Sequence, residues 1–308
     1  MQSKNFVQSF FLLLVLFVVG SFVGSLLGML LIEPIFGIQV MGNTDILNIY
    51  SNNPATPTIL KFLQFFQVFF SFILPAHLFA RYQSNNNSAE YLRLTKTDPV
   101  HYILGAVLIF VISPLISYLS EINQNIVLPS SMSSLEMTLK DLEEKSRIAT
   151  ELFLQVNSAS DIVVNFFIVA LLAAVSEELL FRGVLQRLMS TVIRNIHLNI
   201  FICALIFSAI HFQFYGFLPR LVLGMVLGYA FHFSKSLWVP ILIHFLNNGT
   251  AVMVDILYKR NLISLNPHEN EYFGFVGLSI SIISTITLFW YWIKIYKKSE
   301  KLDGERLD

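Results

Sequence analysis

The sequence is short of charged residues and of cysteine. Only 13% of its 308 residues are charged, whereas 55% are hydrophobic. A soluble domain usually carries about 25% charged residues, so this shortage argues against an ordinary soluble protein and indicates a membrane protein. The 20 basic and 20 acidic residues cancel, and no excess of positive charge points to a nucleic-acid partner. The single cysteine, Cys203, excludes a disulfide within the chain, and we interpret it as a small packing residue.

Long apolar runs take the place of the missing charges. A helix needs roughly 20 mostly apolar residues to cross a bilayer. We therefore predict an all-α integral membrane protein with about eight transmembrane helices, near residues 8–32, 58–80, 100–120, 160–181, 198–215, 217–234, 237–258 and 272–293. The fifth and sixth are short, and only a turn around Gly216 and Pro219 separates them.

The first apolar run has two features of its own. It continues to Ile32, beyond the apolar region of a signal peptide, so we interpret it as an anchored span. Small residues recur along it at four-residue spacing, which favours close contact with another helix. These residues are Gly20, Gly24 and Gly28.

Lysine and arginine are unevenly distributed between the connections. The stretch 33–57 has none, whereas the next connection has Arg81, Arg93 and Lys96, and four lysines follow the last span. Basic residues gather on the cytoplasmic side of membrane proteins. We predict a multi-pass protein of the cell (plasma) membrane with both termini in the cytoplasm. The segment 121–159 fits this rule less well, because it also contains basic residues, and Lys259 and Arg260 are a second exception.

Residues 131–156 predict an amphipathic helix that does not span the membrane, since leucines fall at helical spacing among charges. Such a helix can lie on the membrane surface, cap the external face or form a solvated loop. We predict a single membrane domain with three parts. These are residues 1–159 with spans one to three and the amphipathic external segment, residues 160–258 with the catalytic core, and residues 259–308 with the last span and a charged cytoplasmic tail.

Span four ends in a polar patch of Glu177, Glu178 and Arg182. Ionisable groups inside a membrane are costly and by default indicate a functional site. Glu178 and Arg182 are four residues apart, so they share a helix face and can neutralise each other. Glu177 shares its face with small alanines, which predicts that it points into the helix bundle. A salt-bridged helix end is the structural alternative, and it explains Glu178 and Arg182 better than Glu177.

Two more motif pairs, each with a histidine, lie on later spans, again at four-residue spacing. Phe207 and His211 belong to the fifth, and His244 and Asn248 belong to the seventh. A histidine needs a partner that fixes its tautomer, and Asn248 can be that partner or can donate to an oxyanion. Taken alone, a histidine in a helix is more often structural. Together with the glutamates, these side chains could hold and activate a water molecule.

The three motifs in this order resemble the CPBP family, also named the Abi family or the type II CAAX prenyl endopeptidases. They read EExxxR at Glu177–Arg182, FxxxH at Phe207–His211 and HxxxN at His244–Asn248. The resemblance implies an intramembrane endopeptidase with its catalytic core on spans four to seven and a cavity open to the cytosol. It also implies that Glu177 and His211 activate water, that His244 and Asn248 stabilise the oxyanion, and that Glu178, Arg182 and Phe207 are supporting residues.

The family is commonly described as metalloproteases, and the sequence leaves a metal open. No HExxH motif is present, so this is not the usual zinc-protease helix. Glu177, His211 and His244 could still complete a three-ligand zinc site with an open position. A metal-free water activated by glutamate is equally compatible, and we lean only slightly toward zinc as the cofactor.

The expected function is therefore hydrolysis of a peptide bond in a membrane-associated or lipidated, CAAX-type peptide or protein. The expected partners are membrane lipid and that substrate. A non-proteolytic membrane scaffold or bacteriocin-immunity protein of the same fold is the alternative. A small transporter ranks last, because the sequence has no evident inverted repeat or broken helix.

Overall fold

The computed structural model describes residues 5–38, 55–84, 86–156, 158–264 and 274–305. These ranges are helical with short connections and contain no strand, which confirms the predicted all-α membrane fold. The α-helices are α1 (Phe6–Phe36), α3 (Thr56–Val68), α4 (Leu74–Ser84), α5 (Ser88–Tyr91), α6 (Pro99–Gln124), α7 (Ser133–Phe153), α8 (Ala159–Asn165), α9 (Ala173–Glu178), α10 (Arg187–Met189), α11 (Ile196–Ala209), α12 (Phe217–Ser234), α13 (Trp238–Lys259) and α14 (Gly274–Glu305). Shorter π and 3-10 segments are η1 (Phe69–Ile73), η2 (Ser130–Met132), η3 (Phe166–Leu172), η4 (Leu179–Gln186) and η5 (Phe214–Gly216).

Seven helices of the described chain are long and apolar enough to cross a membrane. They correspond to all the predicted spans except the fifth. The predicted fifth span, 198–215, is instead the shorter apolar helix α11, which has 14 residues. It ends at Ala209, and Phe212 beyond it has a left-handed backbone with φ of 53°. A span count of eight therefore stays a prediction that depends on α11.

The predicted fourth span is longer than expected. It runs without a break over Ala159–Met189 and contains α8, η3, α9, η4 and α10. Its start is fixed by a capping box, in which the Ser158 and Asp161 side chains each bond the other residue's backbone. Two π-helical segments flank the six-residue α9, which carries Glu177 and Glu178. Such π segments often occur at functional sites.

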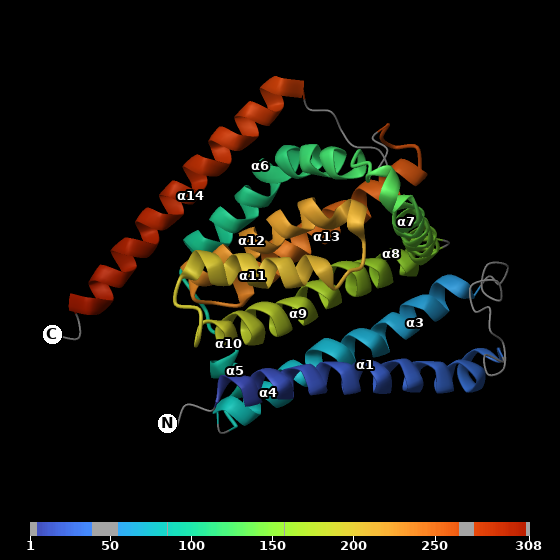
Figure 1. The fold of residues 1–308 in the computed structure, drawn as a ribbon, viewed down its shortest axis with the longest axis horizontal. Helices are drawn as coiled ribbons and strands as arrows, with labels where there is room; N and C mark the ends of the chain where they lie inside the picture. The colour runs from blue at the N-terminus through green and yellow to red at the C-terminus, as the bar shows by residue number, and fades with distance from the viewer. Residues whose placement is uncertain (1–4, 39–54, 85, 157, 265–273, 306–308) are drawn as a thin grey trace.

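The helices form two packed groups (Figure 1). α1 lies beside α3, η1 and α4, while α11, α12 and α13 lie in the centre with α6 on one side and the α8–α10 helix on the other. The predicted glycine stripe lies where α1 packs against α3 and η1. A Cβ on Gly20 would come within 2.0 Å of the Phe70 carbonyl oxygen, and one on Gly24 would come within 2.8 Å of the Phe66 carbonyl oxygen. α14 packs on α6 and, through Trp292, on the core around α12 and α13.

The predicted amphipathic helix is α7, which has no buried residue and is not one of the candidate spans. It contacts α3 and η5. The Gln213 amide donates a hydrogen bond to the Ser146 hydroxyl, which ties α7 to the connection between α11 and α12. α7 therefore covers the end of the bundle at which α11 ends and α12 begins, and that this end is the external face stays a prediction.

Candidate active site

A buried hydrogen-bond network joins three helices at the centre of the bundle. Arg182 Nη1 donates to Glu178 Oε1 at 2.7 Å, and its Nη2 donates to the Gly224 carbonyl of α12 at 3.0 Å. His244 Nδ1, from α13, donates to the same Glu178 oxygen at 2.8 Å. The Glu178 and Arg182 side chains are 0% and 3% exposed, so these bonds form away from water. This network holds α9, η4, α12 and α13 in one arrangement.

Glu177 points into the space beside this network, between two imidazoles. Its Oε2 lies 3.8 Å from His244 Nε2 and 4.0 Å from His211 Nε2. The Glu177 carboxylate is 18% exposed, in contrast to the enclosed Glu178. The two glutamates of the motif thus have different surroundings. Glu178 is enclosed and paired, whereas Glu177 faces the two imidazoles across gaps of 3.8 and 4.0 Å.

The sequence predicts His211 on the fifth span. In the structure it lies instead in the turn just beyond the end of α11. Its Nδ1 donates to the Phe207 carbonyl at 2.8 Å, which leaves Nε2 directed toward Glu177. The Phe207 ring is 1% exposed and lies edge-on to the rings of both His211 and His244, at 5.1 and 6.0 Å between centroids. The Arg182 guanidinium covers the same ring at 4.7 Å. Phe207 is therefore the apolar contact between the two histidines and the buried arginine.

Asn248 has a different partner from the one considered in the sequence. It does not bond His244, whose Nδ1 is occupied by Glu178. Asn248 Nδ2 instead donates to the Val169 carbonyl at 3.2 Å, and Asn247 Nδ2 donates to Asn248 Oδ1 at 3.1 Å. These bonds tie α13 to the π-helical segment η3. Of the two roles expected for Asn248, that of orienting His244 is corrected, because the buried Glu178 carboxylate, a stronger acceptor than an amide oxygen, bonds the ring instead.

The sequence analysis missed a basic residue that acts on this site. Arg220, near the start of α12, interacts electrostatically with Glu177 and with Glu143 of α7. Its Nη2 donates to Gln213 Oε1 at 2.5 Å. No spacing motif connects Arg220 to Glu177. The one signal in the sequence is that Arg220 is a charged residue in the first turn of an apolar span, four residues after Gly216.

The proposed zinc ligands do not match a zinc site as they are arranged. Two ligand atoms of a tetrahedral zinc site lie about 3.3 Å apart, given bond lengths of about 2.0–2.1 Å. The distances from Glu177 to the two imidazoles, 3.8 and 4.0 Å, are longer. No group of three His, Cys, Asp or Glu side chains within the described ranges has the geometry to hold a metal ion.

The helices that carry the candidate site resemble a known protein family. Residues 159–250 match the family model described as "Type II CAAX prenyl endopeptidase Rce1-like". The chain carries an Rce1-like domain. This confirms the family expected from the three motifs, and the Rce1-like domain includes every motif residue from Glu177 to Asn248.

A curated relative of the chain is "Uncharacterized protein YpbD" of Bacillus subtilis (strain 168), which is 31% identical over 86 residues. The match covers 27% of this chain and 41% of YpbD, so the chain spans about two fifths of the length of that relative. No solved structure matches the chain significantly.

Proposed function

We propose that the protein is an intramembrane endopeptidase that cleaves a membrane-associated or lipidated, CAAX-type peptide with water activated by Glu177 and His211. One observation carries the proposal: the Glu177 carboxylate lies within 4.0 Å of the Nε2 atoms of both His211 and His244. The match to a prenyl endopeptidase family supports the reaction class and the substrate class. The apolar spans around the site support a substrate that reaches it from the membrane.

The hydrogen bonds define how the water can be held. With Nδ1 donating to Phe207, the neutral His211 ring has its Nε2 lone pair free to accept a proton. Glu177 Oε2 is a second acceptor at 4.0 Å, and a water oxygen can lie about 2.8 Å from both atoms. Two acceptors on one water leave its lone pairs free to attack a carbonyl carbon. Proton transfer of this kind contributes roughly 10²–10⁴-fold to a rate.

The remaining groups complete the reaction. The water oxygen bonds to the peptide carbon while its proton passes to the Glu177–His211 pair, and the carbonyl oxygen becomes an oxyanion. His244, held by Glu178, presents Nε2–H to the oxyanion when it is doubly protonated, and Asn248 has a second Nδ2–H to donate. Collapse of the oxyanion breaks the C–N bond, and the proton held by Glu177 and His211 passes to the leaving amine.

Peptide cleavage by the detergent-purified protein tests this function. The panel pairs prenylated and unmodified peptides of the same sequence, with wild type beside His211→Ala, and zinc is measured in both proteins. We expect wild type to cleave and His211→Ala to lose at least a hundredfold in rate, with no stoichiometric zinc in either.

Other outcomes point elsewhere. Stoichiometric zinc in wild type, lost in His211→Ala together with activity, would establish a metalloprotease and contradict the metal-free route. Cleavage by neither protein over the whole panel would favour the non-proteolytic scaffold or immunity function.

A further inference from the structure

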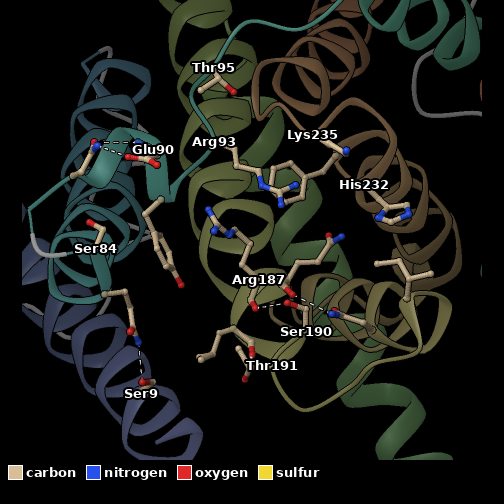
Figure 2. Close-up of a pocket in the computed structure, with 18 residues that line it drawn as sticks. Ser9, Ser84, Glu90, Arg93, Thr95, Arg187, Ser190, Thr191, His232 and Lys235 are labelled. Atoms are coloured by element: carbon tan, nitrogen blue, oxygen red, sulfur yellow. Dashed lines mark hydrogen bonds between the residues drawn. The ribbon is translucent and has the colours of Figure 1, made fainter. Parts of the chain in front are cut away.

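We propose that a second site, at the end of the bundle where α4 ends and α11 begins, binds an anionic phosphate group, either the headgroup of a phospholipid or free phosphate. A cavity of about 1090 Å³ lies there, and Figure 2 shows its lining. Its walls come from the start of α1, the α4–α5 region, the loop before α6, α10, the start of α11 and the end of α12. None of Glu177, His211, His244 and Asn248 lines it, so it is separate from the candidate active site.

Positive charge dominates the lining. Arg93, Arg187 and Lys235 all face the cavity, together with His232 and a single carboxylate, Glu90. Lys235 forms an ion pair with Glu300. Neither arginine has an ion-pair partner in the part of the chain that the structure describes, although Glu90 interacts electrostatically with Arg187 at longer range. The cavity thus keeps two guanidinium groups that no carboxylate of the described chain neutralises directly.

The two arginines are held in place although they repel each other. Both side chains line the same cavity, so their like charges repel each other. The Arg187 guanidinium lies over the Tyr91 ring at 4.4 Å, and that of Arg93 lies over the Phe231 ring at 5.6 Å. Stacking on an aromatic ring fixes the plane of a guanidinium but leaves its N–H donors unused. An anion between the two groups would remove the repulsion and accept those donors.

Two buried polar atoms on the same wall also lack partners among the described side chains. Nη1 of Arg187 is enclosed and makes no hydrogen bond there, and neither does Oε1 of Gln186. A buried donor without a partner costs roughly 1–3 kcal/mol, more when it is charged, and a bound anion would remove that cost at Arg187. Arginine pairs give phosphate oxygens charge-assisted and often bidentate bonds. Ser190 and Thr191 line the same wall, but their hydroxyls donate to the Arg187 and Leu188 carbonyls, so the arginines are the donors on which an anion would depend.

The rest of the lining leaves room for more than the phosphate group itself. The cavity is much larger than one phosphate, and Leu188, Ile196 and Phe231 supply apolar walls beside the arginines. It lies where α1 begins and α4 ends, the end that the lysine and arginine distribution assigns to the cytoplasm. Basic pockets on the cytoplasmic side of a membrane protein suit an anionic lipid headgroup, and free phosphate carries the same chemistry.

Binding to the purified full-length protein tests this site without reference to peptide cleavage. Detergent-solubilised wild type, Arg187→Gln and Arg93→Gln are compared with Arg194→Gln, which removes an exposed arginine outside the cavity. One arm titrates inorganic phosphate and records the thermal unfolding midpoint. The other arm counts, by native mass spectrometry, the lipids retained from nanodiscs of phosphatidylglycerol or of phosphatidylcholine.

We expect wild type and Arg194→Gln to bind at least one probe, and each cavity variant to bind it at least tenfold more weakly. Retention of phosphatidylglycerol without a response to phosphate identifies a lipid site, and the reverse identifies a phosphate site. Equal binding by all four proteins, equal retention of the two lipids with no phosphate response, or no binding by wild type would overturn the proposal. Because two arginines are changed separately, failure of one variant to fold leaves the other as the test.

Discussion

Glu177 and Glu178 are adjacent in the sequence, yet they have opposite surroundings. Glu178 is fully enclosed and receives hydrogen bonds from Arg182 and His244, while Glu177 keeps its carboxylate in the gap between two imidazoles. Helical spacing predicted the bond between Glu178 and Arg182, because residues four apart share a helix face. It could not predict that His244 would bond Glu178, since that contact depends on how α9 and α13 pack.

Arg182 is expected to matter chiefly for stability. Replacing it with methionine leaves Glu178 buried with one charged partner fewer and also removes the donor to Gly224. Breaking a buried pair from one side costs about 3–5 kcal/mol, so Arg182→Met should lower the thermal unfolding midpoint strongly. Arg147→Met on α7 is the control, because its ion pairs are exposed to solvent and contribute little to stability. Equal midpoints for the two variants would contradict the structural role of Arg182.

Hydropathy predicted where the helices lie, because burial of an apolar run in a membrane needs only composition and length. The exact ends followed from features that hydropathy does not contain. α11 stops at Ala209, where the chain turns through a left-handed Phe212, and the fourth span continues to Met189 past a buried arginine. The π segments on both sides of α9 could not be predicted either, because a π-helix differs from an α-helix in its hydrogen-bond register and not in its residue types.

The contact between α1 and α3–η1 predicts unequal effects for two equivalent-looking glycines. A Cβ at Gly20 would lie 2.0 Å from a backbone oxygen of Phe70, whereas one at Gly28 would first meet the flexible Leu63 side chain at 3.0 Å. A backbone atom cannot move aside as a side-chain end can. Gly20→Ala should therefore lower the unfolding midpoint in detergent clearly more than Gly28→Ala. Equal midpoints would show that α1 does not pack this closely.

Across the whole molecule, α1 begins and α14 ends at the same end of the bundle, as two cytoplasmic termini require (Figure 1). The basic residues of the α4–α6 and α10–α11 connections gather at that end, and the charged helix α7 lies away from it. The sequence predicts from charge alone that this end is cytoplasmic, and that assignment stays a prediction. Of the two exceptions to the charge rule, α7 explains the one in segment 121–159. The basic residues in segment 121–159 form ion pairs with acidic neighbours on α7, so they add little net charge.

Labelling with a membrane-impermeant thiol reagent tests the orientation. The only native cysteine, Cys203, is buried and can be replaced by alanine to give a cysteine-free background. Met137 on α7 is 71% exposed, and Lys298 near the end of α14 is also exposed. We expect Met137→Cys to react in intact cells and Lys298→Cys to react only after permeabilisation. The reverse pattern would invert the assigned topology.

The central claim is that Glu177 activates the attacking water, and the rate of peptide cleavage by Glu177→Gln tests it most directly. Glutamine keeps the size of the side chain but cannot accept the proton, and Glu177 is not part of the buried network. We expect the variant to unfold at nearly the wild-type temperature and to cleave at least a hundredfold more slowly. Glu144→Gln, on the exposed face of α7, should cleave at the wild-type rate. Cleavage by folded Glu177→Gln at the wild-type rate would contradict the account.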